Sequence, residues 1–237
     1  MQKPVFTEGQ IYHIFNRGVE KRQIFLNGYD YSRFVHNLFE FNDINPAINM
    51  NYYFDTEQPM EVEPRYFNRK KRSLLVEILA FSLMPNHFHL LIKERRKNGI
   101  VRFMQKLGTG YTMYFNKKYD RVGGLFQGRF KAVLINKESH LIYLPYYIHL
   151  NPIELITYGG STSIDLQKQM DFLENYKWSS FLDYIGEKNF PSITQREFLL
   201  GALNITENEY KKETENFIKE YNNNNLDKIK DVIIDND

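Results

Sequence analysis

The amino-acid sequence predicts an α+β fold, with an antiparallel central sheet flanked by helices. Short apolar runs of strand length are interleaved with longer segments whose apolar residues recur every three to four positions. Two of the strand runs are separated only by the turn signal Pro85-Asn86, so they form an antiparallel pair. An interleaved order that contains at least one such hairpin is typical of the α+β class.

The first part of the chain is expected to contain a strand, a helix and a long insertion. Residues 10–18 are rich in β-forming side chains and end at Gly18, which favours a strand. Residues 30–41 carry apolar side chains at helical spacing behind Asp30, a candidate cap. Residues 42–72 lack periodicity and end in a basic cluster, 69–72, that is either a DNA contact or a solubilising edge.

The middle of the chain predicts the hairpin and a second helix. The strands are expected at 74–83 and 87–93, and the helix at 99–118 despite its two glycines. Gly123-Gly124 breaks the chain before a further strand at 130–135.

A late helix is expected from about Lys137 to Asn151, where Pro152 stops it, with Pro145 inside marking a kink or a restart. The segment around Trp178 is expected to dock onto the main domain. Two helices at 194–203 and 206–221, capped by Thr194 and Thr206, precede a mobile last dozen residues. We therefore divide the chain into a main domain, residues 1–190, and a helical extension, residues 191–237.

Composition limits the class of protein. The chain has 237 residues and is 42% hydrophobic, enough for one substantial domain. It contains no apolar run long enough to span a membrane, and its N-terminus lacks the pattern of a signal peptide. The absence of cysteine excludes disulfides and thiolate metal sites and fits a reducing, cytoplasmic setting.

The net charge of +2 hides an uneven distribution. Residues 93–131 carry eleven basic and two acidic side chains, and residues 204–237 carry nine acidic and five basic ones. Aromatic residues are threaded through the basic segment, and bases stack on rings while phosphates pair with Lys and Arg. This pattern favours nucleic acid over a plain solvated helix face. The candidate DNA-binding residues are Arg17, Arg95, Arg96, Lys97, Arg102, Lys106, Tyr111, Lys117, Lys118, Arg121, Arg129 and Lys131.

Two histidines form the first half of a candidate active site. His87 and His89 lie one residue apart in a predicted strand, so their side chains point to the same face while Phe88 points to the other. Two imidazoles on a rigid support suit a divalent metal. A lone His-x-His is a weak signal, so a second group of residues is needed.

The late helix supplies that second group. Tyr147 and Asn151 are four residues apart and share a helix face, as does Tyr143 one turn earlier. Two imidazoles and an amide oxygen leave positions open for substrate, and the metal could hold a DNA phosphate for attack by a phenolate. By position alone, Tyr143 and Tyr146 stay open as alternative nucleophiles.

The motifs together resemble the REP-associated tyrosine transposases, single-tyrosine members of the IS200-like branch of the HUH (His, hydrophobic, His) nucleases. They occur in the family's order over roughly residues 10–182. The resemblance rests on residues 12–18, 84–91, 111–116, 124–131, 147–152 and 176–180.

The resemblance implies a ferredoxin-like, or palm-like, sheet with His87, His89 and Asn151 as ligands of Mg²⁺ or Mn²⁺ and Tyr147 as nucleophile. It implies an endonuclease and strand transferase that cuts single-stranded DNA beside hairpins and forms a 5′-phosphotyrosine. Neither a membrane nor a small-molecule substrate is expected, and the protein is a monomer or a homodimer. Tyr146, where relatives often carry Arg, the insertion 42–72 and the tail depart from the family pattern.

Two other functions are consistent with the same residues. One is a catalytically silent, domesticated protein of the same fold that binds hairpin DNA. The other is a zinc hydrolase, which needs a further nitrogen ligand from His13, His140 or His149.

Overall fold

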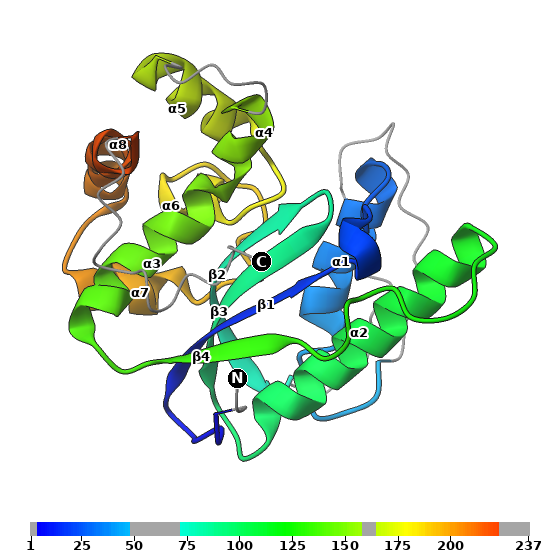
Figure 1. The fold of residues 1–237 in the computed structure, drawn as a ribbon. Helices are drawn as coiled ribbons and strands as arrows, with labels where there is room; N and C mark the ends of the chain where they lie inside the picture. The colour runs from blue at the N-terminus through cyan, green and yellow to red at the C-terminus, as the bar shows by residue number, and fades with distance from the viewer. Residues whose placement is uncertain (1–3, 48–71, 158–164, 223–237) are drawn as a thin grey trace.

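Four strands form one antiparallel sheet at the centre of the molecule (Figure 1). The structure is a computed structural model that describes residues 4–47, 72–157 and 165–222. The sheet order is β2-β3-β1-β4. The strands are β1 (Ile11–Arg17), β2 (Val76–Met84), β3 (His87–Glu94) and β4 (Lys131–Ile135). The predicted α+β class with an antiparallel sheet is confirmed.

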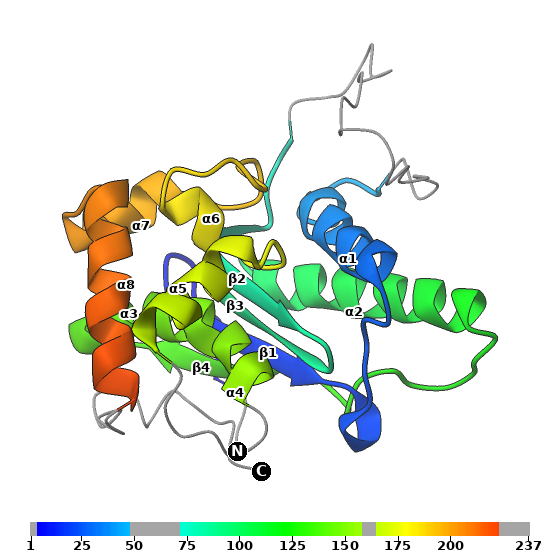
Figure 2. The same cartoon turned by 90° about the horizontal axis from the view of Figure 1, so that it is seen from above.

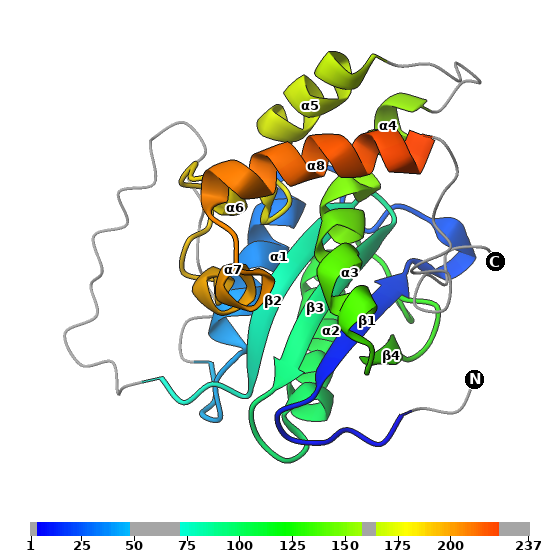
Figure 3. The same cartoon turned by 90° about the vertical axis from the view of Figure 1, so that its left-hand side faces the viewer.

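Helices cover both faces of the sheet (Figures 1 and 2). The long helices α1 (Gly28–Glu40) and α2 (Gly99–Lys118) lie on one face. Apart from the short helix η1, the elements from β1 to β4 follow the β-α-β-β-α-β order of a ferredoxin-like unit. Helix α3 (Glu138–Leu150) crosses the opposite face, and Figure 3 shows α8 (Glu207–Asn222) lying across α3. The remaining helices are η1 (Val19–Lys21), η2 (Asn151–Ile153), α4 (Glu154–Thr157), α5 (Leu166–Asn175), α6 (Phe181–Tyr184) and α7 (Arg196–Leu203).

Side-chain alternation along the strands divides the interior into two cores. Tyr12, Ile14, Phe88 and Leu90 point towards α1 and α2 and belong to the larger core. Leu91, two residues after His89, belongs to the second core, which α3 and the later helices complete. Both faces of the sheet are therefore buried, and a polar side chain on either face must find its partners inside the protein.

Most predicted elements are present, with small corrections at their ends. The predicted helix 99–118 matches α2. Helix α1 is capped by Asn27 and not by Asp30, which is the N3 residue of the capping box and accepts from the Asn27 amide. Thr206 does cap α8, because its hydroxyl accepts from the Glu209 amide at 3.3 Å. Thr194 is not a cap, since α7 begins two residues later behind Gln195. The sequence did not predict α5.

Pro145 does not divide the late helix, because α3 runs through it as one helix that ends at Leu150. The segment around Trp178 docks onto the main domain as predicted. The ring of Trp178 stacks on Tyr31 with a 4.8 Å centroid separation, and its carbonyl accepts from the Leu83 amide. In the part of the chain that the structure describes, no helix is long and apolar enough to cross a membrane.

The two described ends of the predicted insertion are joined to each other. The Asn42 side-chain oxygen accepts from the amides of Leu75 and Val76, and the Ile44 amide donates to the Ser73 carbonyl. We call residues 42–45 and 73–76 the stem. Residues 69–71 of the basic cluster, and the last dozen residues that were expected to be mobile, lie outside the described residues.

Candidate active site

The two histidines of the predicted metal site lie on the α3 face of β3. The antiparallel register sets His87 opposite Arg17 and His89 opposite Phe15 on the central strand β1. His89 is fully buried and His87 is half-buried, and their rings lie edge to face with 5.1 Å between centroids. Phe88 between them is directed into the opposite core, as the alternation predicts.

Each histidine has one ring nitrogen engaged by a neighbour. The Nδ1 atom of His87 lies 2.6 Å from the Asn86 side-chain oxygen, which can only accept, so Nδ1 donates and the Nε2 lone pair remains. The Nδ1 atom of His89 lies 2.9 Å from Nε2 of His13, which is also fully buried. Metal-binding histidines are held in this way by a second hydrogen bond.

Tyr147 is the tyrosine of α3 that contacts these histidines. Its ring lies edge-on to His89, with centroids 6.1 Å apart, and edge-on to His13 at 6.5 Å. The rings of Tyr143 and Tyr146 pack instead against Phe217 of α8. The structure thus separates three tyrosines that sequence position alone left as alternatives.

Asn151 follows the last residue of α3 and faces His87. Its amide nitrogen donates to the Tyr147 carbonyl at 3.0 Å. The Asn151 side chain is also near enough to His87 to raise the pKa of that ring. Its side-chain oxygen is buried and has no hydrogen-bond partner among the described residues. A buried acceptor of this kind costs free energy unless something else binds it.

Burial keeps both histidines neutral. It lowers the pKa of His87 to about 4, with the charge of Arg17 acting in the same direction and Asn151 opposing it. Burial also lowers the pKa of His89 well below its ordinary value, assisted by the neighbouring His87, His13 and Arg17. Neutral imidazole is the form that binds a metal.

The donor set therefore fits a divalent cation held by two imidazole nitrogens and one amide oxygen. Across the described ranges, no three His, Asp or Glu side chains are grouped to hold a metal. Of the candidate third ligands for zinc, His13 already contacts Nδ1 of His89 through its Nε2 atom. His149 is buried elsewhere, between the hydroxyls of Ser180 and Tyr210 at 2.7 and 2.8 Å.

Two of the predicted DNA-binding cations lie beside the histidines. Arg17 is close enough to lower the pKa of both. Lys131 lies opposite Phe15 in the sheet, with its ammonium 5.8 Å from the Phe15 ring, which in turn stacks on His89. These two side chains give the site a positive rim.

Other predicted DNA-binding residues hold the fold together. Tyr111 is fully buried and its hydroxyl donates to the Ile24 carbonyl at 2.6 Å, so the prediction that it contacts DNA is wrong. Lys118 pairs with the buried Asp30 at 2.6 Å. Arg96, Arg102 and Lys106 donate to carbonyls in or next to the stem.

The other predicted cations occupy different settings. Arg95 pairs with Glu77 at 3.5 Å, and Arg121 donates to the Asn116 side chain at 3.3 Å. Lys97, Lys117 and Arg129 are exposed. Burial and pairing of this kind cannot be seen in a count of charges along the sequence.

His13 is the site residue whose role the sequence did not reveal. It lies on β1, two residues before Phe15, and its side chain shares the α3 face with His89. The signal was a histidine in a predicted strand, but the partner depends on the pairing of β1 with β3, which the sequence does not specify.

The fold and the site together define an α+β protein with a histidine pair on a central strand and a tyrosine on the helix that crosses it. Residues 53–151 match the family model "Transposase IS200 like", and the match contains both histidines, Tyr147 and Asn151. It confirms the resemblance to the IS200-like transposases that the sequence motifs indicated.

One solved structure that resembles the chain is "Structure of the REP associates tyrosine transposase bound to a REP hairpin". The TM-score is 0.49 at 14% sequence identity, and the alignment covers 81% of this chain and 88% of the other. No curated protein sequence matches the chain.

Proposed function

We propose that the protein is a metal-dependent endonuclease and strand transferase that cuts single-stranded DNA beside hairpins. The observation that carries this proposal is the edge-on contact of Tyr147 with His89, 6.1 Å between centroids, next to the unsatisfied oxygen of Asn151. A nucleophile, two neutral imidazoles and an amide oxygen come together in one place. The family match to transposases supports the same chemistry.

In the proposed reaction, Tyr147 loses its hydroxyl proton and its oxygen attacks a DNA phosphorus atom. The bond from phosphorus to the 3′ oxygen breaks, and that oxygen takes up a proton. The products are a 5′-phosphotyrosine and a free 3′-hydroxyl, and the reverse attack by a 3′-hydroxyl joins strands. Arg17 and Lys131 at the rim pair with phosphates of the bound strand.

His87, His89 and Asn151 would hold the cation, either Mg²⁺ or Mn²⁺. Such an ion, when bound, polarises a phosphate oxygen and offsets the charge that develops on it. His13 acts on His89: by accepting the Nδ1 hydrogen it fixes the tautomer whose Nε2 lone pair can face the ion. His13 is therefore a positioning residue.

Tyr147 contacts His89, His13 contacts the same ring, and Asn151 donates to the Tyr147 carbonyl, all within one folded chain. This supports an active site built within a single protomer. A monomer would then have a complete site, and a homodimer would not need to exchange α3 between its protomers.

The test is covalent capture. A labelled hairpin DNA with a single-stranded flank, incubated with the protein and Mg²⁺, should give an adduct that survives denaturing electrophoresis. Tyr147→Phe should abolish the adduct, while Tyr143→Phe and Tyr146→Phe should retain it. An adduct that persists in Tyr147→Phe and disappears in Tyr143→Phe would assign the nucleophile to Tyr143.

A hairpin-binding protein without turnover is the second candidate. The observation that favours it is the burial of Tyr147, of which 3% is exposed, because DNA must reach its hydroxyl. That function requires salt-dependent hairpin binding with no adduct under either metal, and binding unchanged by His87→Ala and His89→Ala.

A further inference from the structure

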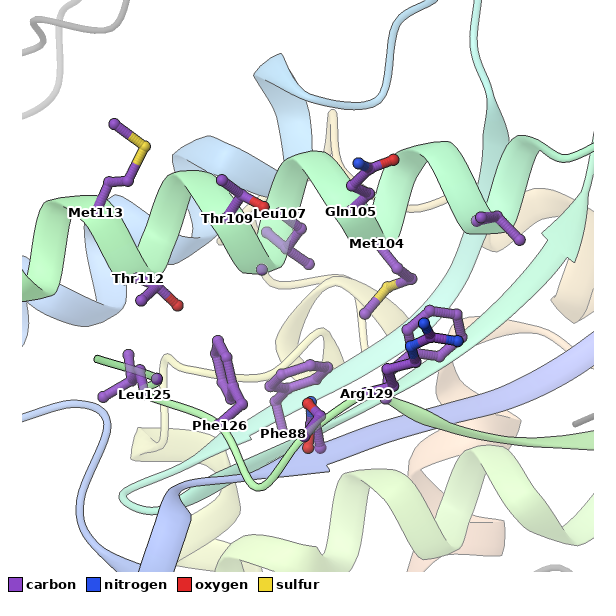
Figure 4. A pocket seen from close by; sticks show the side chains of 16 residues that line it. Phe88, Met104, Gln105, Leu107, Thr109, Thr112, Met113, Leu125, Phe126 and Arg129 are labelled. Carbon is purple, nitrogen blue, oxygen red and sulfur yellow. The ribbon is translucent and has the colours of Figure 1, made fainter.

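Two pockets of the described chain differ in the charge of their lining. The larger has a cavity volume of about 740 Å³ and lies between α2 and the loop that precedes β4, where Phe88 rises towards Met104 (Figure 4). Its described lining contains Arg129 and no acidic side chain. The smaller pocket, of about 270 Å³, lies between α3, the end of α7 and α8. It is lined by Glu213 and Glu220, and none of the described residues around it is a lysine or an arginine. We call it the α3–α8 pocket.

Helix α8 presents a carboxylate, a ring and a second carboxylate along one face. Glu213, Phe217 and Glu220 follow one another at intervals of four and three residues, so they point the same way, and all three line the pocket. The two glutamates are two turns apart, or about 10 Å along the helix axis. Tyr143 and Tyr146 of α3, which α8 crosses (Figure 3), line the pocket from the other helix. The pocket therefore has negative charge at two places, with aromatic side chains between them.

Tyr146 is an independent observation that points to a ligand. It is 5% exposed, and its ring stacks on those of Tyr210 and Phe217, with 4.6 and 5.6 Å between centroids. Because Tyr210 and Phe217 are two turns apart on α8, they cover opposite faces of the Tyr146 ring and leave its hydroxyl edge towards the pocket. This hydroxyl forms no hydrogen bond with a described residue. A buried hydroxyl without a partner costs free energy unless a ligand binds it.

The charge next to that hydroxyl identifies the kind of ligand. Burial raises the pKa of Tyr146, and the nearby carboxylate of Glu213 raises it further. Glu213 accepts from the Asn216 amide at 3.5 Å, and no described cation pairs with it. An anion would be repelled here. An ammonium group has three hydrogens to donate, which suits a carboxylate and a phenol oxygen, and aromatic rings attract cations.

The size and the apolar walls of the pocket describe the rest of the ligand. Ile142, Leu203 and Ile205 also line it, and side chains of this kind cover methylene groups. A cavity of about 270 Å³ lies below the range of drug-sized ligands, which begins near about 300 Å³, so it suits a narrow chain. Two carboxylates two turns apart suit a chain with an ammonium group at each end, whereas a lysine side chain of another protein offers one.

We propose that the α3–α8 pocket binds a free aliphatic polyamine, with one ammonium group between Glu213 and the Tyr146 hydroxyl and the methylene chain running along Phe217 towards Glu220. The site is distinct from the candidate active site, because Tyr146 faces α8 whereas Tyr147 contacts His89. The inference goes beyond the proposed function and does not depend on it.

Spermidine, a linear triamine, is the probe, and calorimetric titration of the full chain measures its affinity without DNA or metal. Tyr146→Phe removes the hydroxyl and keeps the stacked ring, and Glu213→Gln removes the charge. Glu215→Gln is the matched control. It removes the same charge from α8 two residues away, about 200° around the helix, and Glu215 does not line the pocket.

The wild type should bind spermidine, and butanediol, which has an apolar chain but no charge, should not bind detectably. Tyr146→Phe should weaken spermidine binding by about 10-fold, the usual effect of losing a hydrogen bond to a charged group. Glu213→Gln should weaken it by about fivefold, since this carboxylate is exposed. Glu215→Gln should stay within about twofold of the wild type. Without spermidine, Tyr146→Phe should melt no lower than the wild type, because the fold loses no hydrogen bond.

A wild-type protein that does not bind spermidine would overturn the proposal. Equal weakening by Glu213→Gln and Glu215→Gln would also overturn it, since it would show a general attraction to an acidic helix. So would a Tyr146→Phe variant that binds spermidine like the wild type, which would leave the hydroxyl to water. Tighter binding of a short lysine-containing peptide than of spermidine would assign the pocket to a protein partner instead. Covalent capture of DNA uses other residues, so the polyamine proposal and the catalytic one fail separately.

Discussion

Nε2 of His13 lies 2.9 Å from Nδ1 of His89, and both side chains are fully buried. The rings are stacked with 5.1 Å between centroids, so the contact holds the His89 ring in position. His13→Phe keeps a ring of similar shape but removes the acceptor. We expect it to weaken Mn²⁺ binding by about 10- to 100-fold, the usual effect of losing such a partner.

Calorimetric titration with Mn²⁺ measures this effect without DNA or turnover. His13→Gln restores an acceptor and should recover part of the affinity. If His13→Phe binds Mn²⁺ as tightly as the wild type and melts at the same temperature, His13 does not position the ligand.

The second prediction concerns His149 and acid stability. Burial lowers the pKa of His149 to about 3, whereas an unfolded histidine titrates near 6.5. Between these values the unfolded chain binds a proton that the folded chain does not, so stability falls as the pH falls. The contribution of this one group to the free energy of unfolding should decline by up to about 1.4 kcal/mol per pH unit below pH 6.5.

Urea unfolding at several pH values from 4.5 to about 7.5 tests it. His149→Gln keeps hydrogen-bonding groups near Ser180 and Tyr210 and should be less stable than the wild type at pH 7. The difference in free energy of unfolding between the wild type and His149→Gln should become smaller as the pH falls. A gap that stays constant with pH would mean that His149 titrates normally in the fold.

The third prediction separates two adjacent lysines. The ammonium of Lys118 lies 2.6 Å from Asp30, whose side chain is fully buried, and the pair lowers the pKa of that carboxyl even though burial alone raises it. Asp30 also accepts from the Tyr114 and Tyr119 hydroxyls and the Leu26 amide. Lys118→Ala removes the charged donor but leaves these bonds, so it should lower the free energy of unfolding by about 1.5 kcal/mol. Lys117 is exposed, and Lys117→Ala should change it by less than about 0.5 kcal/mol.

DNA binding should show the reverse pattern. Lys117→Ala should reduce the salt dependence of hairpin binding by about the amount that one phosphate contact contributes. Lys118→Ala should leave the salt dependence of the folded protein unchanged. The prediction fails if the two lysines affect stability equally. It also fails if Lys118→Ala produces the larger loss of salt dependence.

The fourth prediction concerns the stem. Lys106 donates to the carbonyls of Asp43 and Asn45 at 2.6 and 2.8 Å. These bonds add to the hydrogen bonds that join the two halves of the stem to each other. Replacing residues 48–71 by a short Gly/Ser linker should therefore leave the melting temperature within a few degrees of the wild type. A deletion variant that fails to fold would show that the replaced segment contributes to the core.

The sequence predicted the elements well because their signals are local. The period-two pattern around Phe88 and the helical spacing of 99–118 depend only on neighbouring residues. The shared face of His87 and His89 followed from the same alternation. The convergence of Tyr147 with that pair is a long-range contact, which the sequence could suggest only through a family resemblance.

What the sequence could not predict depends on pairing and burial. The contact of His13 with His89 requires the register of β1 against β3. Tyr111 and Lys118 belong to a basic, aromatic segment, and only the packing of α1 on α2 shows that one is buried and the other is paired with Asp30. In the sequence, Gly108 only weakens the prediction of a helix. In the structure it lies in α2, where an added Cβ would meet no atom within 4 Å.

The stem has one more consequence. It includes Val76, which pairs with Glu94 at the far end of β3. That end is seven residues, or about 23 Å, from His87. Sequence can therefore be gained or lost between the two ends of the stem at a place remote from the candidate active site. Homologues can differ at that distant end without any change in how the histidines and Tyr147 are arranged.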